Sequence, residues 1–389
     1  LEYAAMSPST EFRPDRDVPW LYGLITLLLF SLAACAMSNR PDPSESGDVP
    51  QLKLAEKVNT VEAGDIAPKE TNKAPAVEEK TVTVALTGDI KLSEAMISDA
   101  HAQAAEGKEY SFLRMYTGAY RTLNGADLAI GMYSALGQPY GTEAEYEPPT
   151  EHIDALSALG FDVLDISGMG SDYALLNERG IKGISSSENT DAVRTVEVGQ
   201  MKLSFVACGY EDTLAQCYSS DDFLKLIEDS DGECDSLVVF VHWDKDMGTD
   251  QKREAVMPLI EAGADVVVGD GETVEAVERV SSDSKEAVVC YSLGNLLSDA
   301  NEAVNLVSGI LTLTYPEDGA ALPDEVAVVP TFVHYSVHED GTRGDYSVYR
   351  VEDYTAELAH SHSCEVDPDG LTGYVRSVFA SGLLPDALK

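Results

Sequence analysis

Basic side chains are scarce in this sequence. Only 26 Lys and Arg residues stand against 68 Asp and Glu residues, which gives a formal net charge of −42. A surface of that charge repels the phosphates of nucleic acids and the headgroups of anionic lipids. Nucleic-acid binding is therefore excluded as a function. The simplest interpretation of the charge is a solvated acidic surface, which suits a protein kept soluble outside the cell.

Closely spaced cysteine pairs are also lacking. The six cysteines form no Cys-x-x-Cys motif, which excludes zinc-finger and thioredoxin-like chemistry. Cys208 and Cys290 lie in apolar runs, as is typical of buried residues. In an oxidising compartment, Cys208 and Cys217 are near enough in sequence to pair across a short loop, although sequence alone does not determine the pairing.

The apolar run at the N-terminus is too short for a membrane span. Residues 21–34 are uncharged, and a spanning helix needs roughly 20 residues, so the run fits a signal peptide better. It ends in Leu-Ala-Ala-Cys35, which resembles a bacterial lipobox. We expect residues 1–35 to be a lipoprotein signal, with Cys35 as the lipid-bearing first mature residue. The alternative is an uncleaved signal anchor that extends through residue 37. Both place the rest of the chain on the extracytoplasmic face of the cell membrane.

The remaining chain divides into three predicted parts. Residues 36–80 are rich in Pro, Glu, Lys, Asp and Ser without apolar periodicity, which predicts a disordered tether. Residues 81–351 alternate short apolar strands with helices, which predicts an α/β domain. Residues 352–389 are expected to form a peripheral helical tail.

The predicted strands and helices follow one another in an order typical of an α/β sheet covered by helices. Strands are expected at residues 81–87, 126–130, 162–166, 202–207, 236–241, 265–268 and 287–292. Helices are expected at residues 93–105, 111–123, 150–159, 221–228 and 251–262. Three further strands, with no long helix between them, predict antiparallel additions at residues 307–314, 325–333 and 346–351.

Several short motifs follow the predicted strands. Gly88-Asp89 ends the first strand, where glycine permits a tight turn and an Asp at a strand's carboxyl edge can bind a metal or orient a substrate. His242-Trp243 follows a later strand. The remaining two motifs are Gly-Ala-Asp-Val-Val-Val-Gly269 and Tyr-Ser-Leu-Gly294-Asn295.

In order and spacing, these motifs resemble the CapA family of poly-γ-glutamate and other capsule-synthesis proteins. The resemblance covers about residues 82–297. It implies a fold similar to the calcineurin-like metallophosphoesterases, namely a two-sheet sandwich flanked by helices (αββα).

The sequence departs from the family at its metal-ligand motifs. Where the family has Gly-Asn-Leu-Glu, residues 131–134 read Gly-Met-Tyr-Ser. Where it has Ala-Asn-Asn-His, residues 167–170 read Ser-Gly-Met-Gly. Where it has Gly-His-His-Pro-His, residues 269–273 read Gly-Asp-Gly-Glu-Thr. Most of the implied Asn, Glu and His ligands are therefore missing.

The surviving ligand positions are Asp89 and His242, with Asp270 as a substitute oxygen ligand. A two-metal centre clamps the attacking and leaving oxygens, and each cation needs several protein ligands. We therefore expect no cofactor at these remnant catalytic positions. The alternative is a single weakly bound divalent cation (Mn, Fe, Zn or Mg).

Three functional hypotheses follow. The first is a surface lipoprotein of capsule or cell-envelope polymer synthesis, more typical of an inactive protein than of an enzyme, which acts through envelope or capsule-assembly proteins. The second is an active metal-dependent phosphoesterase-type hydrolase with an altered centre. The third is a solute-binding lipoprotein that uses the same cleft.

Overall fold

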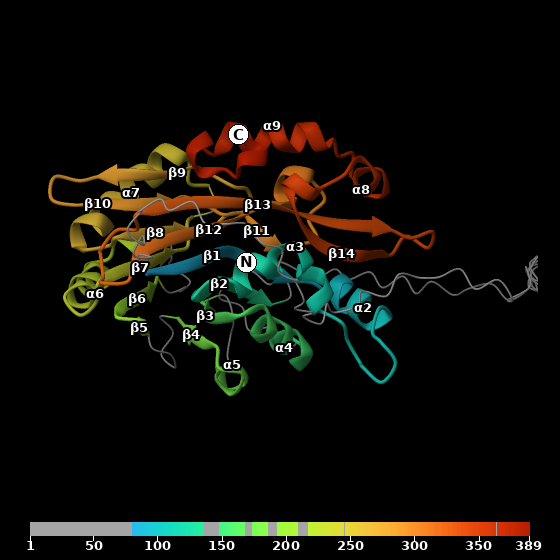
Figure 1. Ribbon diagram of the computed structural model, residues 1–389, viewed down its shortest axis with the longest axis horizontal. Coiled ribbons are helices and arrows are strands. Elements are labelled where there is room, and N and C mark those ends of the chain that lie inside the picture. Colours follow the sequence, from blue (N-terminus) through green and yellow to red (C-terminus); the bar gives the residue numbers. More distant parts are fainter. Residues whose placement is uncertain are drawn as a thin grey trace, which may run out of the picture. The chain divides into compact units, whose positions relative to one another are not determined.

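The computed structural model describes residues 80–135, 148–167, 173–185, 193–208, 217–244, 246–362 and 364–389. The predicted signal and tether, except for Lys80, lie outside these residues, as do positions 168–170 of the departing motifs. The described chain forms two β-sheets with helices packed on them (Figure 1). Within these ranges, no helix is both long and apolar enough to cross a membrane.

The first sheet combines parallel strands with an antiparallel extension. Its strand order is β14-β13-β12-β1-β2-β3-β4, with β11 also paired to β1. The neighbours from β1 to β4 are parallel, whereas β12, β13 and β14 are joined to β1 and to one another by antiparallel pairing, as the sequence predicts. The strands are β1 (Thr81–Leu92), β2 (Leu128–Ala135), β3 (Phe161–Asp165), β4 (Lys182–Ile184), β11 (Asn295–Leu297), β12 (Val307–Pro316), β13 (Glu325–Val337) and β14 (Arg343–Arg350).

The second sheet has the order β5-β6-β7-β8-β10-β9. Its four inner strands are parallel, and the two edge strands are antiparallel to their neighbours. The strands are β5 (Val193–Val198), β6 (Met201–Ala207), β7 (Ser236–Val241), β8 (Val266–Gly269), β9 (Val277–Ser281) and β10 (Glu286–Cys290).

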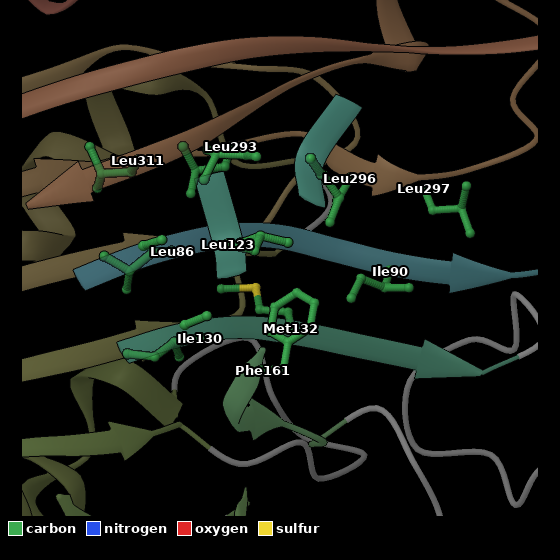
Figure 2. Close-up of a cluster of buried hydrophobic side chains, with 14 of the residues drawn as sticks. Leu86, Ile90, Leu123, Ile130, Met132, Phe161, Leu293, Leu296, Leu297 and Leu311 are labelled. Carbon is green, nitrogen blue, oxygen red and sulfur yellow. The ribbon is translucent and has the colours of Figure 1, made fainter. Parts of the chain in front are cut away.

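Side-chain alternation along β7 shows what covers each face of the second sheet. Val238 and Phe240 belong to the large core that includes the first sheet, part of which Figure 2 shows around β1 and β2. Leu237 and Val239 belong instead to a separate cluster with α6 (Asp221–Asp231) and α7 (Thr249–Ala262). Because successive strand residues point to opposite faces, the second sheet lies between the first sheet and these two helices.

The same reasoning orders the layers of the first sheet. Tyr133 of β2 hydrogen-bonds to His152 of α4 (Thr150–Leu159). Met132, the residue before Tyr133, therefore points away from α4. Its register partner on β3 is Asp165, which contacts His242 just after β7 of the second sheet. The layers run helix, sheet, sheet, helix, which confirms the predicted α/β sandwich.

The other helices pack around this framework. On the first sheet lie α2 (Glu94–Ala102) and α3 (Thr117–Asn124), both against β14, while α5 (Tyr173–Glu178) contacts β4. Residues 352–389 hold α8 (Ala356–Ser361) and α9 (Pro368–Val378). From this last segment, Leu371, Val375 and Phe379 are buried in the large core.

Candidate functional site

Asp89 lies on β1 just after a register shift, where its Cα pairs with Met132 on β2 and with Asn295 on β11. The residue is 2% exposed. Ser134 Oγ donates a hydrogen bond to Asp89 Oδ2 at 2.8 Å, and Lys91 Nζ lies 4.0 Å from the same oxygen. The side chain at position 134 is thus a hydroxyl that binds the Asp89 carboxylate directly.

His242 follows β7 and joins the two sheets. Its Nδ1 lies 2.9 Å from Asp270 Oδ2, just after β8 in the second sheet. Its Nε2 lies 3.0 Å from Asp165 Oδ2, at the end of β3 in the first sheet. His242 is 7% exposed and Asp165 is 1% exposed. Both ring nitrogens therefore bind carboxylates inside the sandwich.

The two carboxylates determine the charge of this histidine. Burial alone lowers the pKa of His242, but the charges and hydrogen bonds of Asp165 and Asp270 raise it, and the net pKa is well above the usual value. Both nitrogens of an imidazolium are donors, which matches the two carboxylate partners of His242. Asp165 also accepts from Ser167 N and Oγ, and Trp243 N donates to Asp270 Oδ1 at 2.9 Å.

The predicted ligand positions form two groups rather than one. Asp89 pairs in register with Met132, and Met132 with Asp165. Asp89 and Asp165 are thus two strands apart, or about 10 Å between Cα atoms at the usual strand spacing. Among the described residues, no three His, Cys, Asp or Glu side chains are placed to hold a metal ion together. Positions 168–170, which belong to one of the departing motifs, lie outside the described residues.

The other motif residues hold the strand ends together. Trp243 Nε1 donates to Tyr291 O at 2.8 Å, across the β8 backbone. A Cβ at Gly269 would lie 1.9 Å from Trp243 Nε1, so only glycine leaves room for the indole. Gly294 adopts a φ of 66°, a left-handed conformation that favours glycine, just before Asn295 enters β11.

Two buried polar residues are important here, although no motif points to them. Asp165 ends an apolar strand, and an acidic residue at a strand end is the sequence feature that could have identified it as a site residue. His152 binds Tyr116 Oη through Nε2 at 2.7 Å and Tyr133 Oη through Nδ1 at 2.9 Å. Burial lowers the pKa of His152 to about 3, so the ring is neutral.

The chain belongs to the bacterial capsule synthesis protein family PGA_cap, whose model matches residues 83–300, more than half of the 389 residues. The CapA resemblance read from the motifs is thereby confirmed. No curated protein matches the chain.

Several solved structures are similar in part. A hypothetical protein from Thermus thermophilus is 15% identical, with a TM-score of 0.40, over 69% of this chain and 98% of its own. NAD nucleotidase from Haemophilus influenzae is 10% identical, with a TM-score of 0.39, over 77% of this chain and 67% of its own. Purple acid phosphatase from yellow lupin is 10% identical, with a TM-score of 0.32, over 70% of this chain and 54% of its own. These likenesses are too weak to bear on activity.

Proposed function

We propose that this protein serves capsule or cell-envelope polymer synthesis without hydrolysing a substrate itself. The polymer role is supported by the family match over residues 83–300. The absence of hydrolysis is supported chiefly by the position of His242, whose two ring nitrogens bind Asp165 and Asp270.

The geometry argues against in-line displacement assisted by two cations. That mechanism requires two ions that clamp the attacking and leaving oxygens, each with several protein ligands. Here Asp89 binds Ser134, whereas Asp165, which binds His242, lies two strands away on β3. In the described chain the candidate ligands are thus divided between two places, and at one of them both carboxylates bind the His242 ring.

Metal analysis combined with an activity assay tests this proposal. We expect the purified full-length protein to contain no stoichiometric Mn, Fe or Zn by elemental analysis. We also expect no hydrolysis of bis(p-nitrophenyl) phosphate above the buffer rate, with or without added Mn²⁺, and no change on Asp89→Asn. Two equivalents of bound metal, or a hydrolase activity that Asp89→Asn removes, would instead establish an active metal-dependent hydrolase.

The place of action is proposed to be the extracytoplasmic face of the membrane, with a lipid on Cys35. Cys208 is disulfide-bonded, and disulfides persist mainly in oxidising compartments. The side chain of Cys217, which is near enough in sequence to pair with Cys208, lies outside the described part of the chain. Cys234 and Cys290 are free thiols.

The lipid anchor is tested by Cys35→Ala. Without the thiol, lipid attachment is impossible, so we expect this variant to stay unprocessed or to leave the membrane fraction in detergent-free fractionation. Cys234→Ala, which removes a free thiol of the folded domain, serves as the control and should fractionate like the parent. Processing and membrane retention of Cys35→Ala at the parent's level would contradict the lipoprotein assignment.

The partners are proposed to be envelope or capsule-assembly proteins rather than the polymer. Poly-γ-glutamate is a polyanion, and this chain has a formal charge of −42. Like charges repel unless salt or bridging cations screen them, so direct contact with such a polymer is unfavourable. A protein partner avoids that cost.

A further inference from the structure

Two buried histidines lie where the segment around α8 meets β13. None of the six residues of α8 is buried, although the helix lies against β13 (Figure 1). The buried side chains are in its flanks, where Tyr354 precedes the helix and His362 follows it. On β13 the facing residue is His334, which is 5% exposed. The attachment of the α8 segment, residues 354–366, therefore depends on the contacts of these three side chains.

The two hydrogen bonds of His362 require its neutral form. Its Nε2 donates to Val333 O at 3.3 Å, and its Nδ1 accepts from Cys364 N at 2.9 Å. An imidazolium carries a proton on both nitrogens and has no acceptor. Protonation of Nδ1 must therefore break the bond from the Cys364 amide, so the charge of His362 is coupled to the position of the chain just after α8.

His334 adds a second ring to the same contact. Its ring lies against that of His362, with 5.2 Å between the ring centroids and 77° between the planes. Its Nδ1 lies 2.9 Å from Tyr354 Oη, which is a neutral partner. Among the described residues, neither ring is hydrogen-bonded to a carboxylate. Two positive charges in this buried contact would repel each other and would lack a counter-ion, which is unfavourable.

The surroundings of the histidine pair are mainly aromatic. Against the two rings lie one thiol and four aromatic side chains, namely Cys364, Phe332, Tyr335, Tyr349 and Tyr354. Of the charged side chains on the neighbouring strands and loop, Arg343 and Asp299 lie beside Tyr335 and Tyr346. On the α8 segment and the turn before it, Asp353, Glu357, His360 and Glu365 are exposed, and Glu352 pairs with Arg350.

The pKa values agree with this arrangement. Burial and the neighbouring His362 lower the pKa of His334 to about 4, although the charge of Asp345 on β14 raises it. Burial also lowers the pKa of His362, against the opposite effect of its hydrogen bond to Val333 O. Both rings are therefore neutral at neutral pH.

We propose that His334 and His362 form an acid-sensitive latch, whose protonation detaches the α8 segment from β13. The opening is local, because Leu371, Val375 and Phe379 hold the following helix in the large core. It also removes the hydrogen bond of 3.0 Å from Cys364 Sγ to Asn301 O, on the loop after β11. This inference does not depend on the proposed role in polymer synthesis.

The direction of the pH dependence follows from proton binding. The pKa of His334 is about 4 when the segment is attached, against the usual 6.5 when the ring is exposed. Between these values the detached state binds more protons, so attachment is complete above about pH 6.5 and weakens as the pH falls toward about 4. At about pH 5, His334 alone should raise the population of the detached state about thirtyfold.

Hydrogen exchange of the full-length protein, followed by mass spectrometry, tests the proposal. Protection factors at about pH 7.5 and about pH 5 are compared after correction for the pH dependence of chemical exchange. We expect peptides from residues 354–366 to lose about tenfold or more of their protection at the lower pH. Peptides from β6, which lies in the second sheet, should change by less than about twofold and serve as the internal reference.

A double variant removes the titration and keeps the hydrogen-bonding groups. In His334→Asn combined with His362→Gln, the amides can still donate and accept but do not take up a proton in this range. We expect the protection of residues 354–366 to become independent of pH. His360→Gln, at an exposed position on α8, is the matched control and should keep the change seen in the parent. Circular dichroism checks that each variant is folded.

Three results would each overturn the latch. They are an equal loss of protection in β6 and in residues 354–366 of the parent, a pH dependence that survives in the double variant, and a pH dependence that His360→Gln removes. If the double variant does not fold, the comparison of β6 with residues 354–366 in the parent and in His360→Gln still decides.

Discussion

We expect His242→Leu to lower the free energy of unfolding by about 3–5 kcal/mol. The substitution removes the imidazolium between Asp165 and Asp270, and Asp165 is almost completely buried. Removing one partner of a buried ion pair leaves an uncompensated charge, and losses of about 3–5 kcal/mol are typical. Urea unfolding of the full-length protein, followed by circular dichroism, measures the change.

A double variant distinguishes charge imbalance from lost packing. Asp165→Asn combined with His242→Leu removes one stranded carboxylate, and the amide can still accept from Ser167. We therefore expect the double variant to be at least about 1 kcal/mol more stable than His242→Leu alone. His360→Leu, at an exposed position on α8, is the control and should change stability by no more than about 0.5 kcal/mol.

The parent and His242→Leu also test whether a metal ion contributes to the contacts of His242. Because the counter-ion of the two carboxylates is a side chain, added EDTA should leave the urea midpoint of the parent unchanged. Added Mn²⁺ should likewise fail to restore His242→Leu. A loss below about 1 kcal/mol for His242→Leu, or a parent midpoint that falls with EDTA, would show that the network does not stabilise the sandwich as described.

Local sequence patterns predicted the layers well because burial dictates them. The run Ser236–Val241 was predicted at its observed bounds, since an uninterrupted apolar strand between polar segments must be covered on both faces. Helix ends were less accurate. Residues 93–105 were expected to be helical, whereas α2 covers Glu94–Ala102, with Ser93 as its N-cap. The side chain of Ser93 accepts from Met96 N, which explains the start.

The site was only partly predictable because its contacts join distant segments. His242 and Asp270 each follow a strand of the second sheet, and their nearness agrees with the rule that polar residues gather at the carboxyl edge of parallel strands. Asp165 belongs to the other sheet, 77 residues earlier than His242. No local pattern encodes how two sheets stack, so the inter-sheet contact could not be read from the sequence.

The first strand is longer than the sequence predicts, and a close backbone contact explains the difference. Gly88-Asp89 was expected to end a strand of residues 81–87, but β1 continues to Leu92. The backbone of Gly88 approaches Gly294 closely, and Asp89 N donates to Gly294 O at 3.3 Å. The strand therefore passes through a register shift instead of turning, and β11 pairs beside it.

This close approach makes Gly88→Ala the second substitution with a large expected effect. A Cβ at residue 88 would lie 1.9 Å from Gly294 O and 3.0 Å from Gly294 C, both backbone atoms that no rotamer change can move. The β11 segment must shift away from β1, and the pairing of Asp89 with Asn295 is lost. Overpacking in a close-packed core costs about 1–3 kcal/mol and more where backbone must move, so we expect a loss of about 3 kcal/mol or more.

Gly373→Ala is the matched control, because a Cβ there meets nothing within 4 Å. It lies inside α9, where alanine is a better helix former than glycine by up to about 1 kcal/mol, so a small gain in stability is expected. Urea unfolding of both variants and the parent compares the two glycines directly. Stability of Gly88→Ala within about 0.5 kcal/mol of the parent would mean that β1 and β11 do not approach as closely as described.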